Sequence, residues 1–434
     1  MIDLVEQPMR LKEAWKRIDQ PRRILLALSG GSDSVALFSM LLTLSKTENI
    51  SFACVHVDHG LRNTSENDAL FCHKLCEKYQ VPFYLKKVTL HSKSENDARQ
   101  ARYLAFSQVY REWKADVLAL AHHSDDQAET VLMHLFRGSG MQGLCGMQES
   151  SCLMVDGCPM RLWRPVIHMN HLQLERISDG FGYGWCLDET NRQDQYLRNF
   201  LRNNILPQIE ERVPKVRQAL CRTAQILQDE NEVLDSMVQP FLKQHTCFKP
   251  PVQWIACSQF DALHKSLKRR VLLHFLPKES SFEHIEAVLS LTDGETVNVP
   301  GGYHVRRSGA YLCLYRDVVQ QKNIASLYAE RAYGRHGDGR HQQALPAELL
   351  KKCHMRYRRP GDVIRPFGMK EHRKLQDYLT DKKIPRPMRD HLPLLCMDDC
   401  VIWVIGVGAG EEVRCAEGKE SLLLTYTDRL PFEI

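Results

Sequence analysis

The stretch LALSGGSDSVAL, residues Leu26–Leu37, decides the fold. An apolar run of strand length, ILLAL over 24–28, leads into it, and a second apolar run of helical length follows it. A glycine-rich turn between a strand and a helix directs backbone N–H groups and the positive end of the helix dipole at a bound anion. Serine hydroxyls add donors. The stretch therefore predicts a phosphate-binding loop made of Ser29, Gly30, Gly31, Ser32, Asp33 and Ser34.

Other glycine motifs do not explain this loop. The P-loop pattern G-x-x-x-x-G-K-[ST] does not occur in the chain. GSGMQG, residues 138–143, matches the dinucleotide pattern, but it follows a helical run instead of a strand, so we treat that match as accidental. A capped turn with Ser29 or Ser32 as the helix N-cap is the simpler alternative. Because a carboxylate beside phosphate needs a cation between them, Asp33 indicates Mg²⁺.

Apolar runs and helical patterns alternate through the first third of the chain. Strands are predicted at 24–28, 52–57, 83–88 and 117–121, and helices at 33–45, 66–79, 95–113 and 126–137. This alternation predicts an α/β fold whose parallel sheet is covered on both faces, with its ligand at the carboxyl ends of the strands. A long helix is expected from about 207 to 242, and a linker over 330–343. We expect three domains, spanning 1–212, 213–330 and 345–434.

Composition limits the remaining classes. The chain has 434 residues, 43% of them hydrophobic, and a net charge of +5. Its 15 cysteines form no C-x-x-C pair, and no apolar run approaches the length of a membrane span. These features favour a cytoplasmic protein with reduced thiols and no membrane partner.

Two further segments carry candidate site residues. ENDARQARY, residues 95–103, places Arg99 and Arg102 on one face of a helix, where they could clamp phosphate; a solvated basic face is the alternative. AHHSDDQAET, residues 121–130, sets His122, His123, Asp125, Asp126 and Glu129 at a strand-to-helix junction over the cleft. A structural transition-metal site is the rival interpretation of that cluster.

The motifs together resemble a known family. SGGSDS resembles the PP-loop of the N-type ATP pyrophosphatases. VDHGLR, A-R-x-x-R-Y, AHHxDDQxET and the following RGSG, with WRPVI, DETN and RNFLRNNILP further on, resemble the bacterial tRNA(Ile)-lysidine synthetase family over about residues 22–242. The resemblance implies an adenine nucleotide alpha hydrolase-like catalytic domain, a helical and α+β middle domain and a small α+β C-terminal domain.

The resemblance also implies an activity and roles for residues. It implies ligation of L-lysine to the wobble cytidine of the isoleucine tRNA with a CAU anticodon, with ATP converted to AMP and pyrophosphate. The loop Ser29–Ser34 would bind ATP and Asp33 would bind Mg²⁺. Asp126 and Glu129 would recognise lysine, and Arg102 and His122 would lie close to ATP. Asp33, Arg102, His122 and Asp126 are the residues we expect to be catalytic.

A basic block lies near the end of the chain. Residues 351–391 contain thirteen lysines and arginines against five acids, a balance that suits a phosphodiester backbone. This block resembles the family's tRNA-binding domain, and the tRNA-contacting residues we expect are Arg358, Arg359, Arg365, Arg373 and Lys374. A solvated basic surface is the alternative. Two alternative functions remain: a tRNA-binding module with a degenerate nucleotide site, and a tRNA thiolase. A homodimer is a possible assembly.

Overall fold

The structure, a computed structural model, describes residues 6–58, 65–88, 95–186, 197–248, 252–316, 327–332, 337–415 and 421–427. The chain forms two compact units, Met1–Glu232 and Val233–Ile434. The boundary between them falls inside one 30-residue helix, α10 (Val216–His245).

The first unit is built on a six-stranded sheet with the order β3-β2-β1-β4-β6-β5. All neighbours pair in parallel except the edge strand β5, which pairs with β6 in an antiparallel hairpin. β1 lies inside the sheet, so the loop that follows it emerges between two parallel neighbours. The strands are β1 (Arg23–Ala27), β2 (Ser51–Asp58), β3 (Phe83–Lys87), β4 (Val117–Ala119), β5 (Ser150–Val155) and β6 (Cys158–Trp163).

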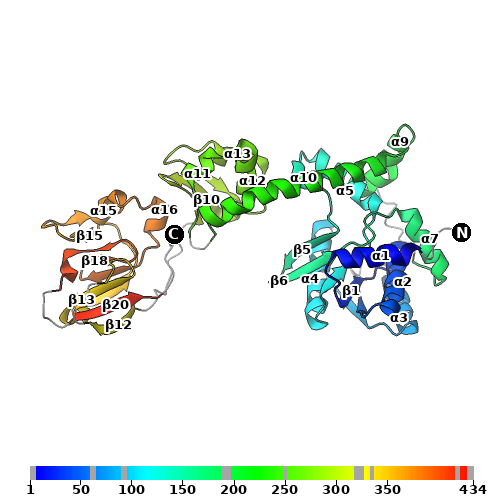
Figure 1. Ribbon diagram of the computed structural model, residues 1–434, viewed down its shortest axis with the longest axis horizontal. Helices are drawn as coiled ribbons and strands as arrows, with labels where there is room; N and C mark the ends of the chain where they lie inside the picture. Colours follow the sequence, from blue (N-terminus) through cyan, green and yellow to red (C-terminus); the bar gives the residue numbers. More distant parts are fainter. Residues whose placement is uncertain are drawn as a thin grey trace. The chain divides into compact units, whose positions relative to one another are not determined.

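Helices cover both faces of this sheet (Figure 1). On one face, side chains of α1 (Glu6–Arg17), α2 (Ser32–Thr47), α3 (Ser65–Lys78) and α7 (His171–Phe181) form one core cluster with the strands. On the other face, α4 (Glu95–Glu112) contributes Tyr103, Phe106 and Val109 to a second cluster. Strand residues on either face of the sheet are therefore buried, and for this reason the strands are continuous apolar runs in the sequence.

The other helices of the first unit come after β4 and after α7 in the chain. α5 (Ser124–Phe136) follows β4, and the short α6 (Met141–Leu144) lies in the glycine-rich segment after it. α8 (Leu197–Phe200) continues without interruption into a π-helical segment, Leu201–Ile205, and then into α9 (Leu206–Glu210). π-helical turns are rare and occur often at functional sites.

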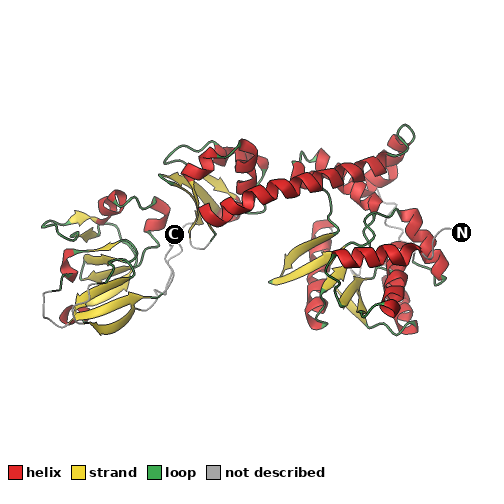
Figure 2. Ribbon diagram, viewed as in Figure 1, coloured by secondary structure: helices red, strands yellow, loops and turns green. Residues whose placement is uncertain are grey.

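The described residues of the second unit form three sheets, whose strands are drawn in yellow in Figure 2. A five-stranded sheet has the order β7-β8-β11-β10-β9, a three-stranded sheet has the order β12-β20-β13, and a third has the order β14-β17-β18-β15-β16 with β19 beside β18. The strands are β7 (Thr246–Cys247), β8 (Val252–Ala256), β9 (Thr296–Val299), β10 (Tyr303–Ser308), β11 (Tyr311–Arg316), β12 (Leu327–Ala332), β13 (Gln342–Pro346), β14 (Cys353–Arg356), β15 (Val363–Ile364), β16 (Arg373–Lys374), β17 (Leu394–Met397), β18 (Cys400–Val404), β19 (Gly408–Ala409) and β20 (Ser421–Tyr426). The helices are α11 (Cys257–Ala262), α12 (Lys265–Phe275), α13 (Phe282–Leu289), α14 (Ala347–Leu350), α15 (Leu375–Asp381) and α16 (Arg386–Arg389).

The predicted α/β alternation is confirmed, with each of the four strands and four helices present to within a few residues. Two expectations were wrong in detail. The long helix is broken between Glu210 and Val216, where Pro214 removes a backbone donor. The linker expected over 330–343 is occupied at both ends by strands, because β12 and β13 pair with β20.

Two of the motifs quoted from the sequence lie partly or wholly outside the described residues. Residues 59–62 of the VDHGLR motif and DETN, 188–191, lie outside the described residues. The GSGMQG segment follows helix α5, as expected for an accidental match. Within the described part of the chain, no helix is long and apolar enough to cross a membrane.

Candidate active site

The predicted phosphate loop joins β1 to α2. Gly30 has φ +93°, a conformation that side chains with a Cβ rarely adopt. The Ser34 hydroxyl accepts from the Gly30 N–H at 3.1 Å and donates to the Gly31 carbonyl at 2.9 Å, so one side chain fixes the turn from inside. Gly31 is the N-cap of α2 and makes no side-chain cap hydrogen bond. The first N–H groups of α2 are therefore presented at the loop, as an anion site requires.

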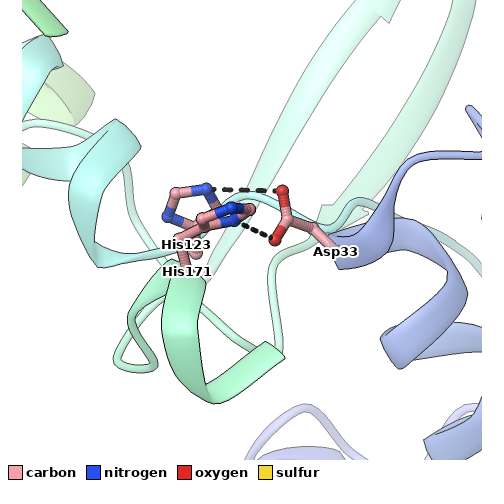
Figure 3. Close-up of side chains that lie close together, drawn as sticks. All are labelled: Asp33, His123 and His171. Carbon is pink, nitrogen blue, oxygen red and sulfur yellow. Dashed lines mark hydrogen bonds and ion pairs between the residues drawn. The ribbon is translucent and has the colours of Figure 1, made fainter. Parts of the chain in front are cut away.

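Asp33, in the first turn of α2, lies against two histidines from other segments (Figure 3). The Nδ1 atom of His171, the first residue of α7, is 2.9 Å from Asp33 Oδ1. The Nε2 atom of His123, the N-cap of α5, is 3.5 Å from Asp33 Oδ2. Burial alone would raise the pKa of Asp33, but hydrogen bonds from His123 and His171 hold this pKa well below its ordinary value. The carboxylate is therefore ionised throughout the physiological pH range.

These three side chains can be tested as a metal site. Asp33, His123 and His171 offer one ligand atom each, and these atoms lie within 4.8 Å of one another. Mg²⁺ takes one or two protein carboxylates and completes its octahedron with water and substrate phosphate oxygens. Asp33 beside a phosphate loop fits that requirement, whereas the two imidazoles are better ligands for a transition metal.

The two predicted lysine-binding carboxylates lie on α5. Asp126 closes the N-terminus of the helix, since its Oδ2 accepts from the His123 N–H at 3.1 Å. Glu129 lies one turn further along and is fully buried. Burial raises the pKa of Glu129, and a hydrogen bond from Arg202 opposes that shift. Burial would also raise the pKa of Asp126, but His123 and other cationic neighbours lower it below its ordinary value.

Arg202, in the π-helical segment, contacts both carboxylates. Its Nε atom is 2.6 Å from Glu129 Oε1, and its Nη2 atom is 3.0 Å from Glu129 Oε2 and 2.9 Å from Asp126 Oδ1. The Nε atom of Arg198 is 3.5 Å from Glu129 Oε2. The sequence pattern RNFLRNNILP was noted without any role for these arginines. Their spacing of four residues on a helix was the available signal that both could reach one acidic residue.

His122 lies beside this cluster in a positively charged environment. Burial, together with the neighbouring Arg164, Arg198 and Arg102, lowers the pKa of His122 to about 3, against an opposite effect of Asp126. The His122 ring is therefore neutral at pH 7. Its buried Nδ1 atom has no hydrogen-bond partner among the described residues.

A cavity of about 1570 Å³ opens over the loop and is lined entirely by residues of the first unit. Its lining includes Ser29, Asp33, His123, His171, Arg202 and Arg217. The loop, both histidines and the arginine that holds the two α5 carboxylates therefore share one cavity. Arg102, an exposed residue of α4, is connected to this region by its electrostatic effect on His122.

His171 is the site residue that sequence analysis missed entirely. It follows Asn170, the N-cap of α7, and stands in no motif that we singled out. His171 reaches Asp33 because helix α7 packs against helix α2. Residues that converge in this way carry no signal in their sequence spacing.

The five residues expected to contact tRNA have different surroundings. Arg359 and Lys374 are exposed. The other three form ion pairs within the second unit: Arg358 with Asp390 at 2.8 Å, Arg365 with Glu412 at 3.0 Å and Arg373 with Asp381 at 2.7 Å.

A parallel sheet with a glycine-serine loop and acidic and basic side chains at its carboxyl edge defines a PP-loop ATP-using domain. The family model for the PP-loop domain matches residues 5–209, and the model for the TilS substrate C-terminal domain matches residues 353–426. The chain is 27% identical to the tRNA(Ile)-lysidine synthase of Clostridium acetobutylicum, covering 95% of this chain and 96% of that protein.

Two further relatives agree. The tRNA(Ile)-lysidine synthase of Geobacter sulfurreducens is 28% identical, covering 97% of this chain and 96% of that protein. That of Histophilus somni is 35% identical over 55% of this chain and 54% of its own length. The chain belongs to the tRNA(Ile)-lysidine synthase family.

Proposed function

We propose that this protein ligates L-lysine to the wobble cytidine of the CAU-anticodon isoleucine tRNA and converts ATP to AMP and pyrophosphate. The observation that carries the proposal is a cavity lined by the phosphate loop and by Arg202, the arginine that binds the buried carboxylates of Glu129 and Asp126. The family relationship over nearly the whole chain supports the same activity.

The reaction must first make a cytosine ring oxygen into a good leaving group. In the proposed first step this oxygen attacks the α-phosphorus of ATP, and pyrophosphate leaves. N–H groups at the start of α2 are suited to hold the pyrophosphate as its negative charge grows, while the hydroxyls of Ser29 and Ser34 keep the loop in shape by bonding to each other and to the loop backbone. Asp33 would hold Mg²⁺, which when bound neutralises charge on the phosphates.

In the second step the ε-amine of lysine attacks the activated ring carbon, AMP leaves and the nitrogen loses a proton. With a reference pKa of about 10.4, few lysine amines are neutral at pH 7, so positioning next to the carbon is important. We assign lysine binding to Asp126 and Glu129. A lysine ammonium there would replace Arg202 as the partner of at least one carboxylate, which is the exchange of one cation for another in a buried site.

We also assign Arg102 and His122 to the ATP side of the cavity. The charges of Asp126 and Arg102 both act on the His122 ring. A neutral imidazole can accept or donate a hydrogen bond without adding charge, which suits a group beside three arginines. The guanidinium of Arg102, on the exposed face of α4, is suited to bind phosphate oxygens.

The C-terminal basic block is our candidate for tRNA binding. Arg359 and Lys374 are exposed and can reach a phosphodiester backbone directly. We assign Arg358, Arg365 and Arg373 to the same surface, where their ion pairs fix the direction of the side chains. The domains that we propose remain 1–212, 213–330 and 345–434. Strand β12 belongs with the last of these domains, because it pairs with β20.

Incubation of the protein with labelled lysine, ATP and total bacterial tRNA tests the activity. We expect label in the isoleucine tRNA with a CAU anticodon, with one AMP and one pyrophosphate formed per lysine joined. A tRNA thiolase would instead need a sulfur donor and would leave lysine unincorporated. A binding module with a degenerate nucleotide site would retain tRNA and form no AMP.

Compartment and assembly are further parts of the proposal. Every cysteine of the described residues is a free thiol, which fits the reducing cytoplasm. A homodimer is the assembly we would test first, by measuring the mass of the protein in solution with and without tRNA.

A further inference from the structure

A histidine, a cysteine and a glutamate come together in and beside the third sheet of the second unit. β15 lies between β16 and β18, and Val363 is the register partner of both Lys374 and Cys400. Cys400 is the first residue of β18, and His372 immediately precedes β16. The third residue, Glu412, lies in the 3₁₀ turn Glu411–Val413.

Ligand atoms of the three residues lie close enough to share an ion. One atom each from His372, Cys400 and Glu412 lies within 4.8 Å of the other two. The Sγ atom of Cys400 is 3.7 Å from His372 Nδ1. In a tetrahedral zinc site with Zn–S of about 2.3 Å and Zn–N of about 2.0 Å, the two ligand atoms are about 3.5 Å apart. The observed spacing is therefore close to that of a metal-bound pair.

Glu412 supplies an independent observation. Its side chain is only 10% exposed. One carboxylate oxygen, Oε1, is paired with Arg365 at 3.0 Å, while the buried Oε2 has no hydrogen-bond partner among the residues that the structure describes. A buried carboxylate oxygen without a partner is costly, and a cation would satisfy it.

The backbone beside Glu412 is shaped to leave this oxygen room. A Cβ on Gly410 would come within 2.9 Å of Glu412 Oε2 and within 3.1 Å of the Arg365 carbonyl oxygen. Glycine at this position lets the carboxylate turn back toward the sheet. Arg365 holds the other carboxylate oxygen, Oε1, as hydrogen-bond donors to metal-bound carboxylates do.

We propose that His372, Cys400 and Glu412 form a Zn²⁺ site in the C-terminal part of the chain. Thiolate, imidazole and carboxylate are the three ligand types of protein zinc sites, and a thiolate with a carboxylate balances the charge of the ion. Water completes the tetrahedron on the exposed side of His372. The ion fixes the short segment His372–Lys374, which carries two of the proposed tRNA contacts, to the edge of the sheet.

The test uses the full-length protein, first stripped of metal with a chelator and then titrated with Co²⁺. We expect one of the Co²⁺ ions bound per chain to show a thiolate-to-cobalt charge-transfer band and the d–d absorption of a tetrahedral ion, both abolished by added Zn²⁺. This band reports a cysteine ligand, so it is distinct from any ion at Asp33, His123 and His171, which contain no thiol. Asp33→Asn should retain the band.

Variants locate the site. Cys400→Ser should abolish the charge-transfer band, and His372→Asn should weaken Zn²⁺ binding at least tenfold. His372 is exposed, so its substitution tests the site without disturbing a core. Cys353→Ser is the matched control, because Cys353 is a half-buried thiol of the same sheet whose Sγ contacts a backbone carbonyl. No thiolate band in the native protein, or a band that survives both Cys400→Ser and His372→Asn, would overturn the proposal.

Discussion

The guanidinium of Arg202 meets the carboxylate of Glu129 side-on, with Nε 2.6 Å from Oε1 and Nη2 3.0 Å from Oε2. This two-bond arrangement is the strongest geometry open to an arginine and a carboxylate. Glu129 is fully buried on α5, whereas the Arg202 side chain is 30% exposed and lines the cavity. Of the two partners, Arg202 is therefore the one with room to move when a competing cation arrives.

Glu129→Gln should raise the KM for lysine by roughly ten- to a hundred-fold, since loss of one partner of a buried ion pair costs a few kcal/mol and each decade corresponds to about 1.4 kcal/mol. Steady-state kinetics at saturating ATP and tRNA would measure it. Glu210→Gln is the control, because Glu210 is paired with Arg217 at the cavity but lies outside α5. A variant that keeps its lysine KM and loses ATP affinity would assign Glu129 to the nucleotide instead.

Asp33→Asn should reduce pyrophosphate release by at least a hundred-fold while the Kd for tRNA changes less than twofold. The reason is that Asp33 faces the phosphate loop and two histidines of the first unit. Pyrophosphate release and filter binding of labelled tRNA are the two measurements. Asp229→Asn, an exposed carboxylate on the lining of the same cavity, should leave both values unchanged. Normal pyrophosphate release by Asp33→Asn at any Mg²⁺ concentration would refute the assignment.

Gly30→Ala should weaken ATP binding and lower the free energy of unfolding by about 1–2 kcal/mol. The cost arises because a Cβ residue at φ +93° is strained and its Cβ would lie 3.3 Å from Cys72 Sγ. Gly138→Ala separates the two causes, since Gly138 also has a positive φ, +71°, but has open space around it. Urea denaturation and ATP titration would compare them. Equal ATP affinity in wild type and Gly30→Ala would show that the loop does not approach the phosphates.

His122 should make the free energy of unfolding depend on pH in the acidic range. Burial and nearby arginines set its pKa at about 3, below the ordinary 6.5, so between these values the unfolded chain binds a proton that the folded chain does not. Stability from this residue is therefore full above pH 6.5 and falls as the pH drops, by about 1.4 kcal/mol per pH unit.

The measurement for His122 is urea denaturation at pH 5.0, 6.0 and 7.0 of the wild type and of His122→Asn. The difference in free energy of unfolding between the two proteins should shrink as the pH falls. His168→Asn, a substitution of an exposed histidine, controls for loss of an imidazole. A difference that is constant with pH would mean that the His122 ring is accessible to protons in the folded state.

Arg359→Ala and Lys374→Ala should each lower the slope of log Kd for tRNA against log salt by about one, because each removes one phosphate contact and its released counterion. Both side chains are exposed, so folding should be unaffected. Lys46→Ala, an exposed lysine near the end of α2, is the control. An unchanged slope in the double variant would remove this surface from the tRNA interface.

The architecture of the first unit was predictable because short stretches of sequence determine its strands and its phosphate loop. Strands buried on both faces must be apolar throughout, and a loop that binds phosphate must contain glycine. The candidate site was predictable only where its residues share a motif, as Asp126 and Glu129 do on α5. His171 and Arg202 reach the site through helix packing and a π-helical turn. The spacing of Arg198 and Arg202 shows that they share a helix face, but no spacing in the sequence connects Arg202 or His171 with its acidic partner.

The order β12-β20-β13 has a consequence for synthesis of the protein on the ribosome. The central strand of this sheet is made last: β13 ends at Pro346 and β20 begins only at Ser421. Until then β12 and β13 have no strand between them, and unpaired strands invite association with other nascent chains. The charged side chains of Glu330 and Arg331 are exposed on β12, and they are suited to keep its unpaired edge from aggregating before β20 is made.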